Sequence, residues 1–363
     1  MLRVRCRTPS ALSVGAFWPN CARPLIARLT QSTIGSDRAT GYRLSYDCAK
    51  NRWVRPMSTA QVYRTVDVPV RGGNLRVGVW EPDATEGAGP PTADVPTIVA
   101  VHGVTASHRC WDMVAERLPG FRIVAPDLRG RGRSNALPGP FGMSQHADDL
   151  ANVLDFLAIP RAMVVGHSMG GFVAVMFAHR HPGRTGGVLL VDGGLTLPMP
   201  EGLTTDSLIA ALGPAADRLT MTFPDHETYQ QFWRVHPAFV DSWNKAVTDY
   251  VDYDLTGTAP EFRPSTTVEA MTGDIPDQYG TPAMLEAVAA LPSPTILLRS
   301  PRGFFNDEPG LYPPDRIRYW QDQLPGLEVR EVAGVNHYTI LFSDVGAAAV
   351  TGAVMQTLQR ALS

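Results

Sequence analysis

The stretch Val164-Val165-Gly166-His167-Ser168-Met169-Gly170-Gly171 decides the fold of this chain. A short apolar strand runs into the pattern Gly-x-Ser-x-Gly, which places a serine on a strained strand-to-helix turn with its hydroxyl exposed at the top of a sheet. Glycines are needed on both flanks because side chains there would collide with the neighbouring strand and helix. Residues 172–178 are apolar and compatible with the expected helix. A free serine hydroxyl is a weak nucleophile, so the pattern predicts a base and an acid elsewhere in the chain.

The composition is typical of a soluble globular protein with a large core, since 44% of the 363 residues are hydrophobic and 18% are charged. This length accommodates one large α/β domain with an insertion, or two smaller domains. No apolar run reaches the roughly 18–20 residues that a membrane span needs. Residues 1–56 hold nine Arg and one Lys against two Asp, a net charge of +8, so the rest carries −11. An acidic body has no general attraction to nucleic acid, and we expect no nucleic-acid partner.

The segment 1–56 shows no hydrophobic periodicity. It lacks the apolar core of a secretory signal, although its Arg-rich, acid-poor composition is also compatible with a transit peptide. Met57-Ser58-Thr59-Ala60 is typical of a protein start, and strand patterning begins directly after it. We therefore expect residues 1–56 to be a disordered extension or a mis-assigned start. The cysteines lack metal-ligand spacing, which predicts a cytoplasmic protein without disulfides.

Alternating and continuous apolar segments predict an α/β architecture. Residues 62–70 and 75–80 alternate around Gly72-Gly73-Asn74, which predicts a β-hairpin. Buried strands then alternate with helices, which is typical of a mostly parallel sheet with helices on both faces. The expected strands are residues 97–101, 121–125, 162–165, 188–191, 295–298 and 327–332, and the expected helices are residues 110–118, 144–157, 169–179, 315–323 and 345–362.

This alternation is interrupted between two parts of the expected core, residues 57–194 and 292–363. Residues 195–291 are rich in Pro, Met and aromatic side chains, and we predict that they form an inserted helical lid. One by one, its aromatic residues are best explained by a small helical core of their own. As a group, some of them would face the sheet and build an apolar pocket over the serine.

Further motifs accompany the serine turn in a defined order. One expected strand ends at His102-Gly103, and the next precedes Asp127-Leu128-Arg129-Gly130-Arg131-Gly132-Arg133-Ser134. A later strand ends at Asp192-Gly193-Gly194, and the last one precedes Gly334-Val335-Asn336-His337. Together with the serine turn, this order resembles the α/β-hydrolase superfamily over residues 60–362. The resemblance is greatest to a lidded branch that holds esterases, carbon–carbon bond hydrolases, cofactor-free haloperoxidases, epoxide hydrolases and haloalkane dehalogenases.

The resemblance implies a role for each matching residue. Ser168 would be the nucleophile, and because epoxide hydrolases and dehalogenases carry aspartate there, acyl transfer to water is the expected chemistry. His337 would be the base that takes the proton from Ser168 and returns it to the leaving group. The backbone N–H groups of Val104 and Met169 would form the oxyanion hole. In the motif at 127–134, Asp127 and Arg129 are expected to be structural, with no part in the chemistry.

Three carboxylates are candidates for the acid that would complete a triad with Ser168 and His337. Most of the superfamily carries it shortly after the strand that matches residues 295–298, where this chain has Arg299-Ser300-Pro301-Arg302-Gly303 and no carboxylate. The next ones, Asp307 and Glu308, come several residues late. A minority pattern moves the acid to the end of strand 188–191, which is Asp192 in this chain. We favour Asp192 over Asp307, and Asp307 over Glu308; the alternative role for Asp192 is capping of the following glycine loop.

These observations predict a serine hydrolase that acts on a small apolar ester-like or similarly activated carbonyl substrate. One alternative in the same fold is a carbon–carbon bond hydrolase, which would need a cation such as Arg299 or Arg302 to hold a substrate carboxylate. Others are a cofactor-free haloperoxidase or perhydrolase, and a non-catalytic member that only binds a ligand. No His, Cys, Asp or Glu cluster has metal-ligand spacing and no Gly-x-Gly-x-x-Gly follows a strand, so we expect neither a metal nor a nucleotide cofactor.

Overall fold

The computed structural model describes residues 45–47, 52–54, 60–83, 95–198 and 212–362. The chain divides into two units, Met1–Met57 and Ser58–Ser363. In the first unit, strands β1 (Ser45–Asp47) and β2 (Arg52–Val54) pair antiparallel. Most of residues 1–56 lies outside the described residues. The interpretation of this segment as a disordered extension or a mis-assigned start therefore stays a prediction.

An eight-stranded sheet forms the centre of the second unit, in the order β12-β11-β8-β7-β5-β6-β4-β3. The pairs β3–β4 and β4–β6 are antiparallel, and the other neighbours are parallel. The predicted fold class, a mostly parallel sheet opened by a hairpin, is confirmed. The strands are β3 (Gln61–Val70), β4 (Gly73–Pro82), β5 (Thr97–Val101), β6 (Arg122–Pro126), β7 (Ala162–His167), β8 (Thr185–Val191), β11 (Thr295–Arg299) and β12 (Leu327–Glu331).

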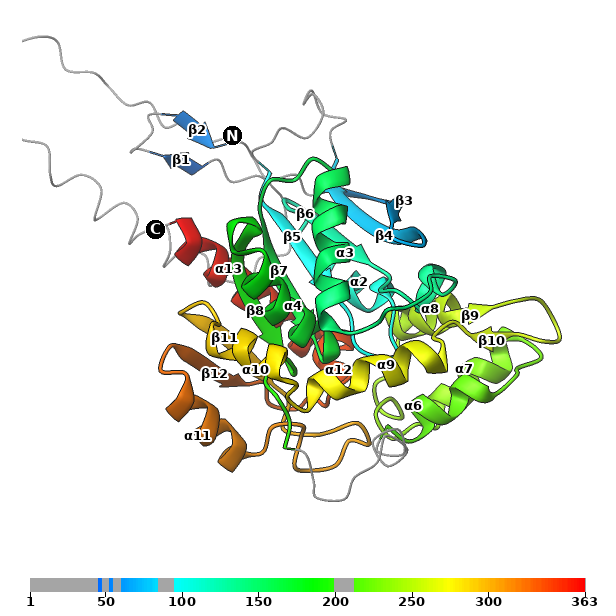
Figure 1. The fold of residues 1–363 in the computed structure, drawn as a ribbon. Helices are drawn as coiled ribbons and strands as arrows, with labels where there is room; N and C mark the ends of the chain where they lie inside the picture. The colour runs from blue at the N-terminus through cyan, green and yellow to red at the C-terminus, as the bar shows by residue number, and fades with distance from the viewer. Residues whose placement is uncertain (1–44, 48–51, 55–59, 84–94, 199–211, 363) are drawn as a thin grey trace, which may run out of the picture. The chain divides into compact units, whose positions relative to one another are not determined.

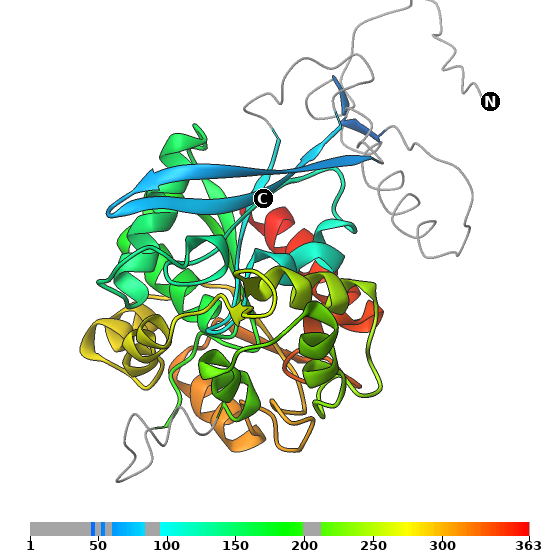
Figure 2. The ribbon, with the colours of Figure 1, turned by 90° about the vertical axis from the view of Figure 1, so that its right-hand side faces the viewer.

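Helices cover both faces of this sheet (Figure 1). Residues of β5 alternate between two buried apolar clusters: Val99 and Val101 belong to the first, and Ile98 and Ala100 belong to the second. The first cluster holds the apolar faces of α3 (Met143–Phe156) and α4 (Met169–Arg180), and the second holds those of α2 (Asp112–Ala115) and α13 (Asp344–Leu362). Figure 2 shows the β3–β4 hairpin, in blue, extending along one edge of this body.

Between β8 and β11 the chain leaves the sheet and forms a mainly helical insertion; Figure 1 shows most of it at one end of the sheet, while its last helix packs against α4. Residues 199–211 of this segment lie outside the described residues. The limits 195–291 and the role as a lid stay predictions. The elements are α6 (Pro214–Asp217), the 3₁₀ turn η4 (Arg218–Thr220), α7 (His226–Arg234), α8 (Lys245–Asp254), the pair β9 (Leu255–Thr256) and β10 (Arg263–Pro264), α9 (Val268–Gln278) and α10 (Pro282–Ala289).

The remaining helices lie in the loops that connect the strands, except the last one, which lies between β12 and α13. They are η1 (His108–Trp111), η2 (Gly132–Ser134), η3 (Pro182–Arg184), α11 (Pro314–Gln323) and α12 (Thr339–Phe342). Across the described ranges, no helix combines the length and the apolar character that crossing a membrane would require.

The strand-to-helix turn at Ser168 is as tight as its sequence pattern requires. Ser168 has φ 54° and ψ −125°, a conformation that L-residues rarely adopt. A Cβ atom on Gly166 would lie 2.0 Å from the carbonyl oxygen of Gly170, and one on Gly170 would lie 2.1 Å from that of Val101. Both obstacles are backbone atoms, which cannot rotate away as a side chain can. Only glycine fits at these two positions.

The substitution Gly170→Ala is expected to lower the free energy of unfolding by about 1–3 kcal/mol, because the backbone of β5 must move to admit the new methyl group. Gly352→Ala is the matched control: Gly352 lies within α13, and a Cβ there meets no atom within 4 Å. Alanine should stabilise this helix by about 0.5–1 kcal/mol. Urea unfolding followed by circular dichroism measures both values, and equal effects would contradict this account of the turn.

Candidate active site

A pocket opens at the ends of β5, β7, β11 and β12 and encloses about 420 Å³, part of it continuous with solvent. Its walls come from the loop after β5, from the serine turn, from the insertion and from the segments after β11 and β12. In the described part of the chain, no Lys, Arg, Asp or Glu lines it. The lining residues are Gly103, Val104, Thr105, Ala106, Cys110, His167, Ser168, Leu212, Ala215, Tyr250, Phe304, His337, Tyr338 and Phe342.

Ser168 stands at the N-terminus of α4, where the helix backbone presents unpaired N–H groups and favours negative charge. Its side chain does not cap the helix. Within the described ranges the hydroxyl makes no hydrogen bond with the side chain of His337, and both residues line the same pocket. Such catalytic contacts are often long before substrate binds. The hydroxyl is therefore available to a substrate.

His337 is paired with a buried carboxylate. Its Nδ1 lies 2.7 Å from Oδ2 of Asp192, and both side chains are almost completely buried. Asp192 also accepts hydrogen bonds from Ser300, from Oγ at 2.5 Å and from the backbone N–H at 3.0 Å. Burial opposes ionisation, but the hydrogen bonds from His337 and Ser300 hold the pKa of Asp192 below its ordinary value. An ionised Asp192 keeps the proton of His337 on Nδ1, which leaves Nε2 free to accept one.

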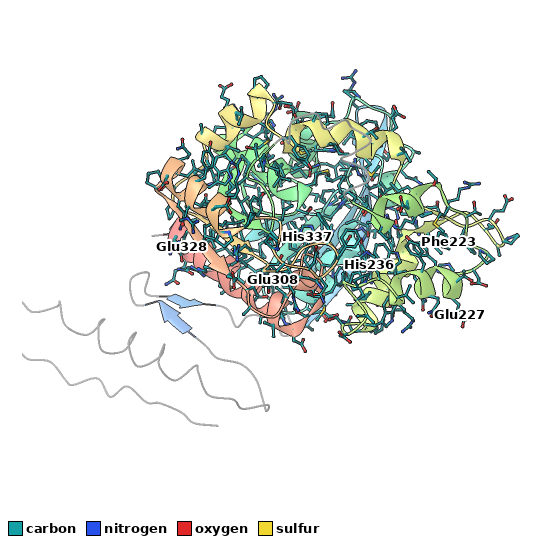
Figure 3. The ribbon with its side chains drawn as sticks, turned by 90° about the horizontal axis from the view of Figure 1, so that it is seen from below. Phe223, Glu227, His236, Glu308, Glu328 and His337 are labelled. Atoms are coloured by element: carbon teal, nitrogen blue, oxygen red, sulfur yellow. The ribbon has the colours of Figure 1, made fainter. Side chains whose placement is uncertain are left out.

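The structure brings His337 to Asp192 and leaves the other two candidate acids apart. Asp307 and Glu308 are exposed, and the backbone oxygen of Asp307 accepts a hydrogen bond from Gly303. Figure 3 shows His337 near the middle of the view, with Glu308, which follows β11, drawn below it. This geometry agrees with the preference for Asp192 over Asp307. The catalytic role of each residue remains a proposal.

The loop that carries Val104 passes directly over Ser168. A Cβ on Gly103 would lie 3.1 Å from the Cβ of Ser168 and 3.5 Å from its Oγ. His102 orients this loop: its Nε2 accepts the N–H of Leu128 at 2.9 Å, so Nδ1 carries the proton and donates to the Gly103 carbonyl at 2.8 Å. Burial lowers the pKa of His102 to about 4, which keeps this arrangement neutral. In a trans peptide the Val104 N–H points opposite to that carbonyl.

His167 contacts the backbone of His337. Its Nε2 lies 2.8 Å from the carbonyl oxygen of His337, and the two rings stand 4.8 Å apart. Burial, together with the neighbouring His337, lowers the pKa of His167 to about 3. His167 is therefore a neutral donor that anchors the His337 backbone. This contact gives His167 a place in the serine turn beside the site.

The contacts of Asp127 and Arg129 agree with the structural role expected of them, whereas Arg131 donates a hydrogen bond to the carbonyl of Val104. Asp127 receives hydrogen bonds from the backbone N–H groups of His108 and Arg133 and from the hydroxyl of Tyr253. Its Oδ1 also lies 2.7 Å from Nδ1 of His108. Arg129 forms a buried two-point ion pair with Asp149, with both N–O distances at 3.0 Å.

The insertion contributes fewer aromatic side chains to the pocket than its composition suggested. Of the eight aromatic residues between positions 223 and 253, Tyr250 lines the pocket. Phe223, Tyr229, Trp233 and Phe239 are buried against one another and the second apolar cluster. These aromatics therefore do not form a helical core of their own, because they belong to the apolar cluster that also covers one face of the sheet.

Sequence reasoning missed several residues of the site. Three aromatic walls of the pocket, Phe304, Tyr338 and Phe342, come from the segments after β11 and β12. Their nearness to His337 along the chain was the available signal for two of them. Ser300 was passed over because only a carboxylate was sought after β11. In the described part of the chain, no group of three or more His, Cys, Asp or Glu is placed to hold a metal ion.

The chain belongs to the alpha/beta hydrolase family, whose model matches residues 98–350. It is 37% identical over 100 residues to lipase LipV of Mycobacterium tuberculosis, covering 28% of this chain and 38% of that protein. It is 40% identical over 91 residues to the bifunctional esterase/perhydrolase DCH of Acinetobacter calcoaceticus, covering 24% of this chain and 33% of that protein. The chain thus spans less than half the length of the curated relatives it matches.

Solved structures share the fold. E-2-(acetamidomethylene)succinate hydrolase is 19% identical with a TM-score of 0.64, over 81% of this chain and 100% of that one. A thioesterase domain from the curacin biosynthetic pathway is 20% identical with a TM-score of 0.62, over 81% of this chain and 99% of that one. At such identities the likeness describes the fold alone.

The pairing of His337 can be tested without any substrate. Asp192→Asn should abolish the far-downfield proton resonance of His337 Nδ1 in a protein labelled with ¹⁵N-histidine, because an amide does not hold the ring in the same tautomer. Asp307→Asn is the control and should leave that resonance in place. Loss of the resonance in Asp307→Asn with retention in Asp192→Asn would contradict the observed geometry.

Proposed function

We propose that this protein is a carboxylesterase-like serine hydrolase that cleaves an ester-like or similarly activated carbonyl substrate through an acyl-enzyme on Ser168. One observation carries the proposal. Ser168, whose side chain does not cap the helix that follows it, lines the same pocket as His337, and Nδ1 of His337 faces the buried carboxylate of Asp192. Membership of the alpha/beta hydrolase family supports a hydrolase, and relatives named lipase and esterase support an ester. The cytoplasmic location expected from cysteine usage is part of the same proposal.

In the proposed reaction, Ser168 Oγ attacks the carbonyl carbon while Nε2 of His337 takes its proton. The negative charge that develops on the carbonyl oxygen is stabilised by the N–H groups of Val104 and Met169. His337 then gives the proton to the leaving group, and the carbonyl bond re-forms as the acyl-enzyme. Water hydrolyses the acyl-enzyme by the same steps. Asp192 keeps Nδ1 protonated throughout and stabilises the charged imidazole.

The walls of the pocket favour an uncharged, apolar acyl group. Aromatic and aliphatic side chains surround Ser168, and no cation among the described residues lines the cavity. A buried carboxylate without a partner is strongly disfavoured. We expect such a pocket to select substrates by the shape and the apolar area of the acyl group.

The carbon–carbon hydrolase alternative receives no support from its candidate cations. Arg299 pairs with Glu331 and donates to the carbonyl of Tyr312, and Arg302 donates to the carbonyl of Gly334. Neither arginine is among the residues that line the pocket. A substrate carboxylate would find no partner there.

The first test is hydrolysis of p-nitrophenyl esters from acetate to decanoate. Ser168→Ala and His337→Ala should abolish turnover, and Asp192→Asn should lower kcat by up to about 10⁴-fold because the histidine loses its orientation. Asp307→Asn is the matched control and should retain wild-type rates. A wild-type protein that hydrolyses no ester and does not react with a fluorophosphonate probe would overturn the proposal and favour a ligand-binding member.

A second test addresses the charge of the acyl group. p-Nitrophenyl butyrate should be hydrolysed with a kcat/KM about 100-fold or more above that of p-nitrophenyl hemisuccinate, a substrate of similar length that ends in a carboxylate. Equal rates for the two esters, measured at the same pH, would contradict an uncharged pocket. A preference for the hemisuccinate would favour the carbon–carbon hydrolase alternative.

A further inference from the structure

The loop after β5 is held at three successive carbonyl groups. Besides the bond from His102 to Gly103, the carbonyl of Val104 accepts a hydrogen bond from Nε of Arg131 at 3.0 Å. The carbonyl of Thr105 accepts one from Nη2 of Arg218 at 2.9 Å. Both guanidinium groups are completely buried. Burial of a charged group is costly unless it is paired and hydrogen-bonded, so each needs a partner.

Those partners come from the insertion. Nη1 of Arg131 lies 2.6 Å from Oδ2 of Asp274 on α9, and Nη2 of Arg218 lies 3.0 Å from Oδ2 of Asp254 at the end of α8. Burial opposes ionisation of Asp274, but His146 and Arg131 lower the pKa of its carboxyl to about 2. Two elements of the insertion thus supply the countercharges for the two arginines that hold the loop.

Further contacts within the insertion hold the side chain of Arg218 in this position. Its Nε donates to the hydroxyl of Tyr229 at 2.8 Å, and its Nη1 donates to the carbonyl of Ala215. Its guanidinium also stands over the ring of Trp233, 5.0 Å from the centroid. Tyr229, Ala215, Trp233 and Asp254 all belong to the insertion. The bond to Thr105 is the hydrogen bond by which this network reaches the loop beside Ser168.

We propose that Arg218 is a positioning residue for the oxyanion hole, and that the insertion, through Arg218 and Arg131, holds in place the loop whose Gly103–Val104 peptide His102 orients. This inference rests on the proposed function. Each peptide unit is a rigid plane. Hydrogen bonds that fix the carbonyls of Gly103, Val104 and Thr105 therefore fix the backbone torsion angles of Val104 and Thr105, which lie between these planes. The donor is then in place before charge develops, and no reorganisation is needed in the transition state. Arg131 also reaches Sδ of Met169, at 3.9 Å.

The experiment separates oxyanion binding from filling of the pocket. A trifluoromethyl ketone with an alkyl chain adds to an active serine and forms a hemiketal whose oxygen is negatively charged, whereas the corresponding trifluoromethyl alcohol occupies the pocket without forming one. The double variant Arg218→Met/Asp254→Asn removes the buried pair together and leaves no unpaired charge. Its inhibition constant for the ketone should rise about 10–100-fold, with kcat falling in parallel, because one oxyanion donor is misplaced. Its constant for the alcohol should stay within about twofold of wild type.

Arg129→Met/Asp149→Asn is the matched control. It removes a buried Arg–Asp pair of the same kind, whose side chains do not contact the loop after β5. It should lower stability without changing the ratio of the two inhibition constants. Tyr229→Phe is the mild variant: it deletes one hydroxyl that accepts from Arg218 and donates to Asp254. It should keep the fold and raise the ketone-to-alcohol ratio several-fold.

An unchanged ratio in Tyr229→Phe and in the folded double variant would overturn the positioning role, and Tyr229→Phe alone decides if the double variant does not fold. A parallel loss of affinity for ketone and alcohol would also overturn it, because that result indicates general damage to the pocket. An unreactive wild-type protein would overturn the proposed function and this inference together. A reactive wild-type protein with an unchanged ratio would overturn the inference alone.

Discussion

Backbone packed directly against backbone around Ser168 is the constraint on which the rest of the site depends. The turn contacts the end of β5 through Gly170 and the end of β8 through Gly193, whose Cβ would lie 2.0 Å from the carbonyl oxygen of Ser168. The Ser168 N–H bonds to the carbonyl of Val191 at 3.0 Å. Asp192, the next residue, also has a positive φ, 46°. Two strained residues, each costing about 1–3 kcal/mol, are thus held by one another and by the buried sheet.

A second constraint is a set of buried polar contacts between the insertion and the sheet-bearing core, one of which is an ion pair. Arg131 with Asp274 crosses this boundary, Arg218 crosses it through Thr105, and Tyr253 crosses it to reach Asp127. A buried ion pair is often no more stable than an apolar replacement, but loss of one partner costs about 3–5 kcal/mol. Many displaced arrangements of the insertion would leave such a partner alone. The charges therefore favour one placement of the insertion over others that bury as much apolar area.

Local patterns account for what could be predicted from the sequence. The strands, the helices around them and the serine turn follow from alternation, apolar runs and glycine spacing, all of which are properties of neighbouring residues. Asp192 was favoured because it ends a buried strand, and it lies against His337. The contact of Arg218 with Thr105 joins residues 113 positions apart, and no periodicity encodes it. The pocket aromatics Phe304 and Phe342 likewise depend on how loops pack after the sheet has formed.

The hydrogen bond between Ser300 and Asp192 has a consequence for how sites of this fold can change. β8 and β11 are parallel neighbours, with Val191 beside Leu298, and Ser300, two residues further on, donates two hydrogen bonds to Asp192 at the same edge of the sheet. The ends of β8 and β11 are thus two adjacent positions for a single carboxylate near His337. A second carboxylate introduced at position 300 would lie in contact with that of Asp192, and two such groups ionise together only reluctantly and share a proton instead.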